Sequence, residues 1–157
     1  MLSFAYGSSM DIAQTRSRCR NPNLKAECIA KLGDHRLAFT RWSTKRACGV
    51  ADAVPAPGKE VWGVIFELND AELELLDESE GYCATRACGQ NSYVREERVV
   101  CRDGDETQPL KVQVYFVLKK GNFRPSYEYK NLILKGARAH LPQSYISELE
   151  KTPVEGS

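Results

Sequence analysis

Runs of apolar residues divide most of the chain into expected strands. The strongest run is 60–68, whose nearly continuous apolar character predicts a strand buried on both faces. Gly63 in its middle predicts a bulge or a close approach of another group to the backbone. Turns are expected at Gly33-Asp34 and at Pro55-Ala56-Pro57-Gly58. The remaining strands are expected over 4–6, 26–32, 35–42, 49–54, 92–102 and 110–119.

Helical spacing and end signals predict four helices. Asn69 can cap the second helix, and Glu72 stands at its third position, as in a capping box. Gly81 predicts its end, and Asp11 can cap the first helix. The expected helices cover 11–18, 70–80, 126–140 and 142–149.

The order of these elements predicts the fold class. Strands outnumber helices, and helices cross over between only some of them, which is typical of an α+β protein. We therefore expect a small, curved, mostly antiparallel β-barrel with helices packed around it. A length of 157 residues suits one domain, expected over 1–151, with 152–157 as a loose C-terminal tail.

The composition gives no reason to expect a charged macromolecular partner. The chain is 42% hydrophobic and 27% charged, and 22 basic against 21 acidic side chains give a net charge of +1. This balance predicts neither a nucleic-acid nor a membrane partner. No apolar run approaches the roughly 20 residues of a membrane span, and the N-terminus has no basic region typical of a signal peptide. We expect a cytoplasmic protein.

Cysteine and histidine spacing predicts no metal site. None of the six cysteines forms a C-x-x-C pair, and Cys83 and Cys88, which could approach each other across a loop, have no evident further ligands. His35 and His140 lie in unrelated segments and lack the i, i+4 partner of a metal-binding helix. Neither histidine can be assigned as the base for a serine or cysteine nucleophile.

The N-terminal segment 4–10 predicts a small binding concavity. An apolar strand over 4–6 runs into Gly7-Ser8-Ser9 and then into the first expected helix. Such a strand–turn–helix directs several backbone N–H groups into one space, which suits an anionic group. The alternative is a tight turn that binds nothing, because short glycine turns are common.

One of the six acids in 70–80 is expected to point inward. At about 100° per residue, Glu80 falls between Leu73 and Leu76 in azimuth, on the apolar face. Burial and the helix C-terminus would both raise its pKa. The alternative is that the helix frays after Asp77 and leaves Glu80 in solvent.

Five segments together resemble the γ-glutamylcyclotransferase family. They occur in the family's order and span about 4–149, nearly the whole chain. They are FAYGSSM at 4–10, Arg20-Asn21-Pro22, GVADAVPAPGKEVWGVIFEL at 49–68, LDESEG at 76–81 and PSYEYKNLILKGA at 125–137.

This resemblance implies a small β-barrel and a set of site residues. Glu80, the glutamate of LDESEG, would be the catalytic acid/base, and the Tyr6–Ser9 turn would hold the γ-glutamyl group through backbone amides. Ser9 is a departure, because family members commonly have Asn there. The residues expected at the substrate are Tyr6, Gly7, Ser8, Ser9, Met10 and Tyr129.

The reaction that the resemblance implies needs few groups. The free α-amine of a γ-glutamyl-amino acid attacks its own γ-carbonyl, which gives 5-oxoproline and a free amino acid, with no cofactor or metal. Alternatives are another leaving group (an amine, a γ-glutamylated metabolite or glutathione), or a non-catalytic module that binds a small anion or a partner. Glutathione is the less favoured substrate because Ser9-Met10-Asp11 lacks the bulky apolar residue typical of the glutathione-degrading branch. We expect a small-molecule substrate and a monomer or homodimer.

Overall fold

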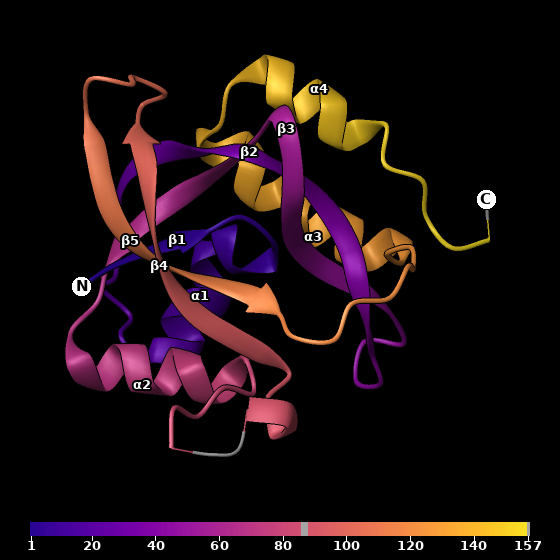
Figure 1. The fold of residues 1–157 in the computed structure, drawn as a ribbon, viewed down its shortest axis with the longest axis horizontal. Coiled ribbons are helices and arrows are strands. Elements are labelled where there is room, and N and C mark those ends of the chain that lie inside the picture. The colour runs from indigo at the N-terminus through magenta and orange to yellow at the C-terminus, as the bar shows by residue number, and fades with distance from the viewer. Residues whose placement is uncertain (86–87, 157) are drawn as a thin grey trace.

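The computed structural model describes residues 1–85 and 88–156, and five of its strands form a closed barrel (Figure 1). Around the barrel the order is β1-β3-β2-β4-β5. All neighbours are antiparallel except β1 and β5, which pair in parallel. The expected α+β class and mostly antiparallel barrel are confirmed. The strands are β1 (Leu2–Ala5), β2 (Ala26–Ser43), β3 (Cys48–Glu67), β4 (Tyr93–Arg102) and β5 (Pro109–Val117).

Strands β2 and β3 are each longer than the sequence predicts. The turns expected at 33–34 and 55–58 do not end a strand. Instead the pairing register shifts there, from Gly33–Glu60 to His35–Pro55. Gly58 has a φ of +77°, and its N–H donates to the Asp34 side chain at 3.0 Å. The turn signals therefore bend a continuous ribbon, because the side-chain contact replaces the missing ladder bonds.

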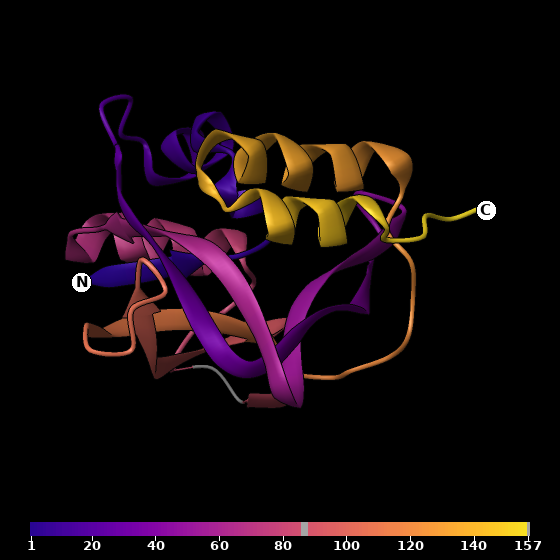
Figure 2. The same ribbon diagram turned by 90° about the horizontal axis from the view of Figure 1, so that it is seen from above.

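Helices cover two sides of the barrel. Figure 1 shows α1 and α2 together on one side, and Figure 2 shows α3 and α4 as a pair over the bent β2–β3 ribbon. The Asp11 cap and the Asn69–Glu72 capping box are both formed as predicted. The helices are η1 (Ser8–Met10), α1 (Ile12–Cys19), α2 (Asp70–Ser79), η2 (Cys88–Gln90), α3 (Tyr127–His140) and α4 (Gln143–Glu150).

The segment after α4 is held to the domain by backbone groups. The Glu155 N–H donates to the Pro125 carbonyl at 2.9 Å, and Lys130 Nζ donates to the Thr152 carbonyl at 2.8 Å. These two bonds connect Thr152 and Glu155, in the segment expected to be a loose tail, to residues of the domain. Within the described ranges, none of the helices is long and apolar enough to cross a membrane. The expected approach of Cys83 to Cys88 involves a side chain outside the described part.

Gly63 lies where β3 passes closest to β1. A Cβ at this position would lie 2.3 Å from the Ala5 carbonyl oxygen and 2.8 Å from the Phe4 ring. The close approach predicted from the sequence is confirmed. Any side chain here would push β1 away from β3, because real Cβ atoms do not approach backbone oxygen so closely.

We predict that Gly63→Ala lowers the free energy of unfolding by about 1–3 kcal/mol, the usual range for overpacking a core. Urea unfolding of both proteins measures the difference. Gly33→Ala is the matched control, because a Cβ there would meet no atom within 4 Å. Equal stability of the Gly63→Ala and Gly33→Ala proteins would contradict this account of the β1–β3 contact.

Candidate active site

A cavity of about 290 Å³ lies beside the first strand and brings together distant segments. The turn after β1, the start of β3 and the end of α2 all contribute to its wall. Six residues expected at the site line it together: Tyr6, Gly7, Ser8, Ser9, Glu80 and Tyr129.

Three neighbours fix the backbone of the turn. A Cβ on Gly7 would lie 2.9 Å from the Ala51 Cβ, so β3 closes one side. A Cβ on Gly136 of α3 would lie 2.6 Å from the Met10 backbone, so α3 closes a second. On the third side, Thr15 Oγ1 of α1 donates to the Ser9 carbonyl at 2.6 Å. The turn is therefore rigid and already shaped before any ligand arrives.

Met10 is not among the residues that line this cavity. Its side chain is 1% exposed and belongs to the hydrophobic core. The reason is the α3 contact, which turns residue 10 into the core while Ser8 and Ser9 stay at the cavity. The expected contact of Met10 with the substrate therefore has no counterpart in the lining of this cavity.

Glu80 occupies the position directly after α2. The helix continues to Ser79, so it does not fray after Asp77. The Glu80 N–H donates to the carbonyls of Leu76 and Asp77 at 3.0 and 3.1 Å. Its side chain is 16% exposed and lines the cavity, as its azimuth relative to the leucines predicts. It is the C-cap residue, one position beyond the expected last turn.

A serine and an arginine contact the Glu80 carboxylate. Ser9 Oγ lies 3.5 Å and Arg18 Nη1 3.7 Å from the same oxygen, Oε1. Arg18 Nη1 also lies 3.5 Å from Ser9 Oγ. The residue that replaces the family's usual Asn is therefore directly beside the candidate acid/base.

Burial raises the pKa of Glu80 above the ordinary value for glutamate. Arg18, the Ser9 hydrogen bond, Arg41 and Arg46 act in the opposite direction, but the loss of hydration is the larger effect. A carboxyl group in this balance can hold a proton more readily than a solvated one while cations keep its charged form accessible. Such a group suits acid/base chemistry.

Two tyrosines are bonded to the backbone of one residue of β3, Ala51. Tyr129 Oη accepts from the Ala51 N–H at 3.0 Å, and Tyr93 Oη donates to the Ala51 carbonyl at 2.7 Å. Burial raises the pKa of both phenols. Both are therefore neutral at ordinary pH, and the cavity wall they form is polar without being charged.

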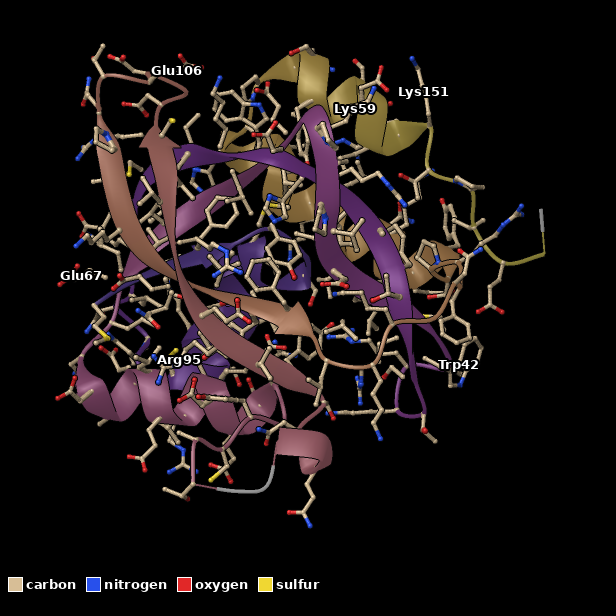
Figure 3. All side chains as sticks on the ribbon, in the orientation of Figure 1. Trp42, Lys59, Glu67, Arg95, Glu106 and Lys151 are labelled. Atoms are coloured by element: carbon tan, nitrogen blue, oxygen red, sulfur yellow. The ribbon has the colours of Figure 1, made fainter. Side chains whose placement is uncertain are left out.

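A chain of contacts ties the end of α2 to the barrel. Tyr6 Oη donates to the Tyr115 carbonyl at 2.5 Å, and Tyr115 Oη donates to Asp77 Oδ1 at 2.5 Å. Arg95 Nε of β4 lies 2.8 Å from the same Asp77 oxygen, and Figure 3 shows Arg95 beside α2. Asp77 is three residues before Glu80, so these contacts position the catalytic candidate.

Sequence reasoning missed several residues of the cavity and of the contacts that support it. Asp77 stands in the LDESEG segment and could have been noticed there, but its partners come from other strands. The arginines and Tyr93 have no local signal, because the closing of the barrel brings them to the cavity. The missed residues are Arg18, Arg41, Arg46, Asp77, Tyr93 and Tyr115. Among the described residues there is no group of side chains with the makeup of a metal site.

Comparison with known proteins gives consistent matches. The sequence profile of the AIG2-like family matches residues 60–149. A gamma-glutamylcyclotransferase of Mus musculus is 34% identical over 155 residues, which cover 95% of this chain and 77% of that protein. The gamma-glutamylcyclotransferase of Homo sapiens is 32% identical over 95% of this chain and 77% of its own length. A solved structure of a gamma-glutamyl cyclotransferase superimposes with a TM-score of 0.86 at 29% identity, covering 100% of this chain and 90% of that one.

We predict that Arg18→Gln raises the pKa of Glu80 further, because it removes the nearest cation and leaves burial unchanged. Titration of the Glu80 side-chain carboxyl carbon by NMR measures this directly. Arg102→Gln is the control, because Arg102 is an exposed arginine on β4 that pairs with Asp103 instead. An unchanged or lowered pKa in Arg18→Gln would show that Arg18 does not stabilise the carboxylate.

Proposed function

The chain belongs to the γ-glutamylcyclotransferase family, and we propose that it cyclises γ-glutamyl-amino acids to 5-oxoproline with Glu80 as its acid/base. One observation carries the residue assignment: a carboxyl group with a raised pKa lies in the same cavity as the rigid Tyr6–Ser9 turn. The enzyme class follows from the relatives, which are themselves gamma-glutamylcyclotransferases.

The substrate supplies both reacting groups. Its α-amine nitrogen bonds to its own γ-carbonyl carbon, and the bond from that carbon to the leaving nitrogen breaks. The enzyme has to fold the substrate so that these atoms meet, and alignment of this kind can remove up to roughly 7–11 kcal/mol of barrier in the best cases. The rigid walls around the turn suit this task, because little order has to be gained on binding.

Glu80 would move the proton between the two nitrogens. Its carboxylate takes a proton from the substrate ammonium, whose reference pKa is about 8, and the resulting acid gives a proton to the leaving nitrogen. The raised pKa of Glu80 narrows the gap to the ammonium, so it helps proton removal. One group can serve in both steps because the proton taken up in the first is delivered in the second.

The Tyr6–Ser9 turn would hold the γ-glutamyl group through its main chain. In the described part of the chain, the turn's own bonds use the N–H groups of Met10 and Asp11. The N–H groups of Ser8 and Ser9 are then available for the substrate. Tyr129 supports this side of the cavity, since a Cβ on Gly7 would lie only 3.7 Å from its hydroxyl. The Ser9 hydroxyl donates a hydrogen bond to Glu80 instead of binding the substrate.

The structure bears differently on the two alternative functions that the sequence leaves open, a binding module and an enzyme with another leaving group. A non-catalytic anion-binding module would gain nothing from a carboxylate 16% exposed in its cavity, and the relatives are enzymes. A substrate with another leaving group, such as an amine, would react through the same Glu80 chemistry. The preference between leaving groups then depends on the other residues of the cavity. We also propose that the protein is a cytoplasmic monomer or homodimer. The net charge of +1 supports the further proposal that it has no nucleic-acid or membrane partner.

Glu80→Gln keeps the shape of the side chain and removes proton transfer. We predict a fall in turnover of at least about 10²-fold, the lower end for general acid–base catalysis, with the unfolding free energy nearly unchanged. Glu74→Gln is the matched control, because Glu74 is an exposed acid on the same helix and does not line the cavity. Near-normal turnover of Glu80→Gln would remove Glu80 from the mechanism.

The identity of the attacking group can be tested with an N-acetylated substrate. We predict 5-oxoproline as the first product from γ-glutamyl-alanine and no reaction with N-acetyl-γ-glutamyl-alanine, because acetylation removes the nucleophilic amine. Chromatography of early time points measures both products. Free glutamate as the initial product, or cleavage of the acetylated compound, would mean that water or an enzyme side chain attacks, and would overturn the proposed function.

A further inference from the structure

Two arginines lie on the same wall of the cavity as the paired tyrosines. Arg41 Cζ is 5.9 Å from the centre of the Tyr93 ring, and Arg46 Cζ is 5.0 Å from the centre of the Tyr129 ring. Both rings are bonded to Ala51, one through its N–H and the other through its carbonyl. The two guanidinium groups therefore lie over rings whose hydroxyl groups both bond to Ala51.

Neither arginine has a carboxylate partner among the described residues. Arg46 Nη2 donates to the neutral Gln14 Oε1 at 2.8 Å, and the Arg41 guanidinium lies over the Tyr93 ring. Both are half-buried, and both line the cavity. Arg18, by contrast, has Glu80 beside it. Withdrawing a guanidinium group from water costs free energy that a nearby anion offsets, so a negatively charged group of a ligand is favoured at this wall.

The position of Arg46 is linked to the turn that would hold the substrate. Gln14 accepts from Arg46 and donates from Nε2 to Ser8 Oγ at 3.1 Å. The Arg46 guanidinium is thus positioned relative to the turn by one intervening side chain. Arg41 and Arg46 both lower the pKa of Glu80, so their charges lie close enough to be felt at the proposed acid/base.

The charged groups of the substrate can be matched to these partners. The γ-glutamyl half carries an ammonium, which must face Glu80, and a carboxylate, to which the turn's N–H groups can donate hydrogen bonds. A leaving amino acid adds one more carboxylate, whereas a leaving amine adds none. The planar donor fork of arginine binds carboxylates in two-point contacts that a neutral group cannot replace.

We propose that Arg41 and Arg46 bind the α-carboxylate of the leaving amino acid and so select γ-glutamyl-amino acids over γ-glutamyl-amines. The proposal rests on the proposed function and adds to it the chemistry that the leaving group must carry. Exposed Lys45, which also lines the cavity, adds positive charge at the same opening.

Two substrates that differ only by this carboxylate provide the test. γ-Glutamyl-ethylamine is γ-glutamyl-alanine without the α-carboxylate, and 5-oxoproline release gives kcat/KM for each. The wild-type enzyme is expected to prefer γ-glutamyl-alanine by at least about tenfold, the value of one charge-assisted hydrogen bond. Arg41→Gln and Arg46→Gln are each expected to reduce this preference by about tenfold, mainly through a higher KM for γ-glutamyl-alanine.

The ratio of the two substrates separates this contact from other effects of the substitutions. A change in the pKa of Glu80 in the free enzyme, or a displaced Tyr129, alters both rates alike and leaves the ratio unchanged. Arg46→Lys, which keeps the charge but loses the fork, is expected to fall between wild type and Arg46→Gln. Arg138→Gln, at an exposed arginine of α3 outside the cavity, is the control and should leave the ratio as in wild type.

The possible results separate failure of the carboxylate contact from failure of the proposed function. Equal kcat/KM for both substrates in the wild-type enzyme, or an unchanged ratio in both Gln variants, would overturn the carboxylate contact. In that case 5-oxoproline release would still support the proposed function. No 5-oxoproline from either substrate would overturn the proposed function, and the inference with it.

Discussion

The close packing of β3 and α3 against residues 5–10 is the constraint on which the site depends. Glycines make this approach possible: Gly7 beside Ala51, Gly63 beside Ala5, and Gly136 beside the Met10 backbone. At each contact a Cβ would lie under 3.0 Å from another atom. Because β1 also closes the barrel between β3 and β5, the same contacts that complete the fold also shape the proposed substrate turn.

The position of Glu80 depends on a second set of contacts at the end of α2. The capping box starts α2 at Asp70. Because the helix then runs to Ser79, its C-cap residue, Glu80, lies at the cavity. Asp77, bonded to Tyr115 and paired with Arg95, holds this end of the helix against β4 and β5. The proposed acid/base is therefore placed by a polar contact on one side of the helix and by the apolar packing of its leucines on the other.

Local sequence signals were sufficient for the four α-helices and for the inward position of Glu80, but not for the full length of β2 and β3 or for the rest of the cavity. Caps and apolar spacing located the helices, because these signals act within a few residues of one another. The turn signals at 33–34 and 55–58 were misleading, since side-chain contacts let β2 and β3 continue through them. Arg41 and Arg46 were missed because their partners are set by the folding of β2 and β3 onto Tyr93 and Tyr129, which lie far along the chain.

The balance of burial and positive charge at Glu80 explains how one carboxyl group can act as base and then as acid. Burial raises its pKa, while Arg18, Arg41 and Arg46 lower it and keep the carboxylate populated. If a substrate carboxylate binds to Arg41 and Arg46, as proposed, it cancels part of their field at Glu80. The pKa of Glu80 then rises when the substrate ammonium is beside it, and the carboxylate becomes a stronger base at the step that needs one. Selection of the leaving group and activation of Glu80 would thus arise from the same pair of arginines.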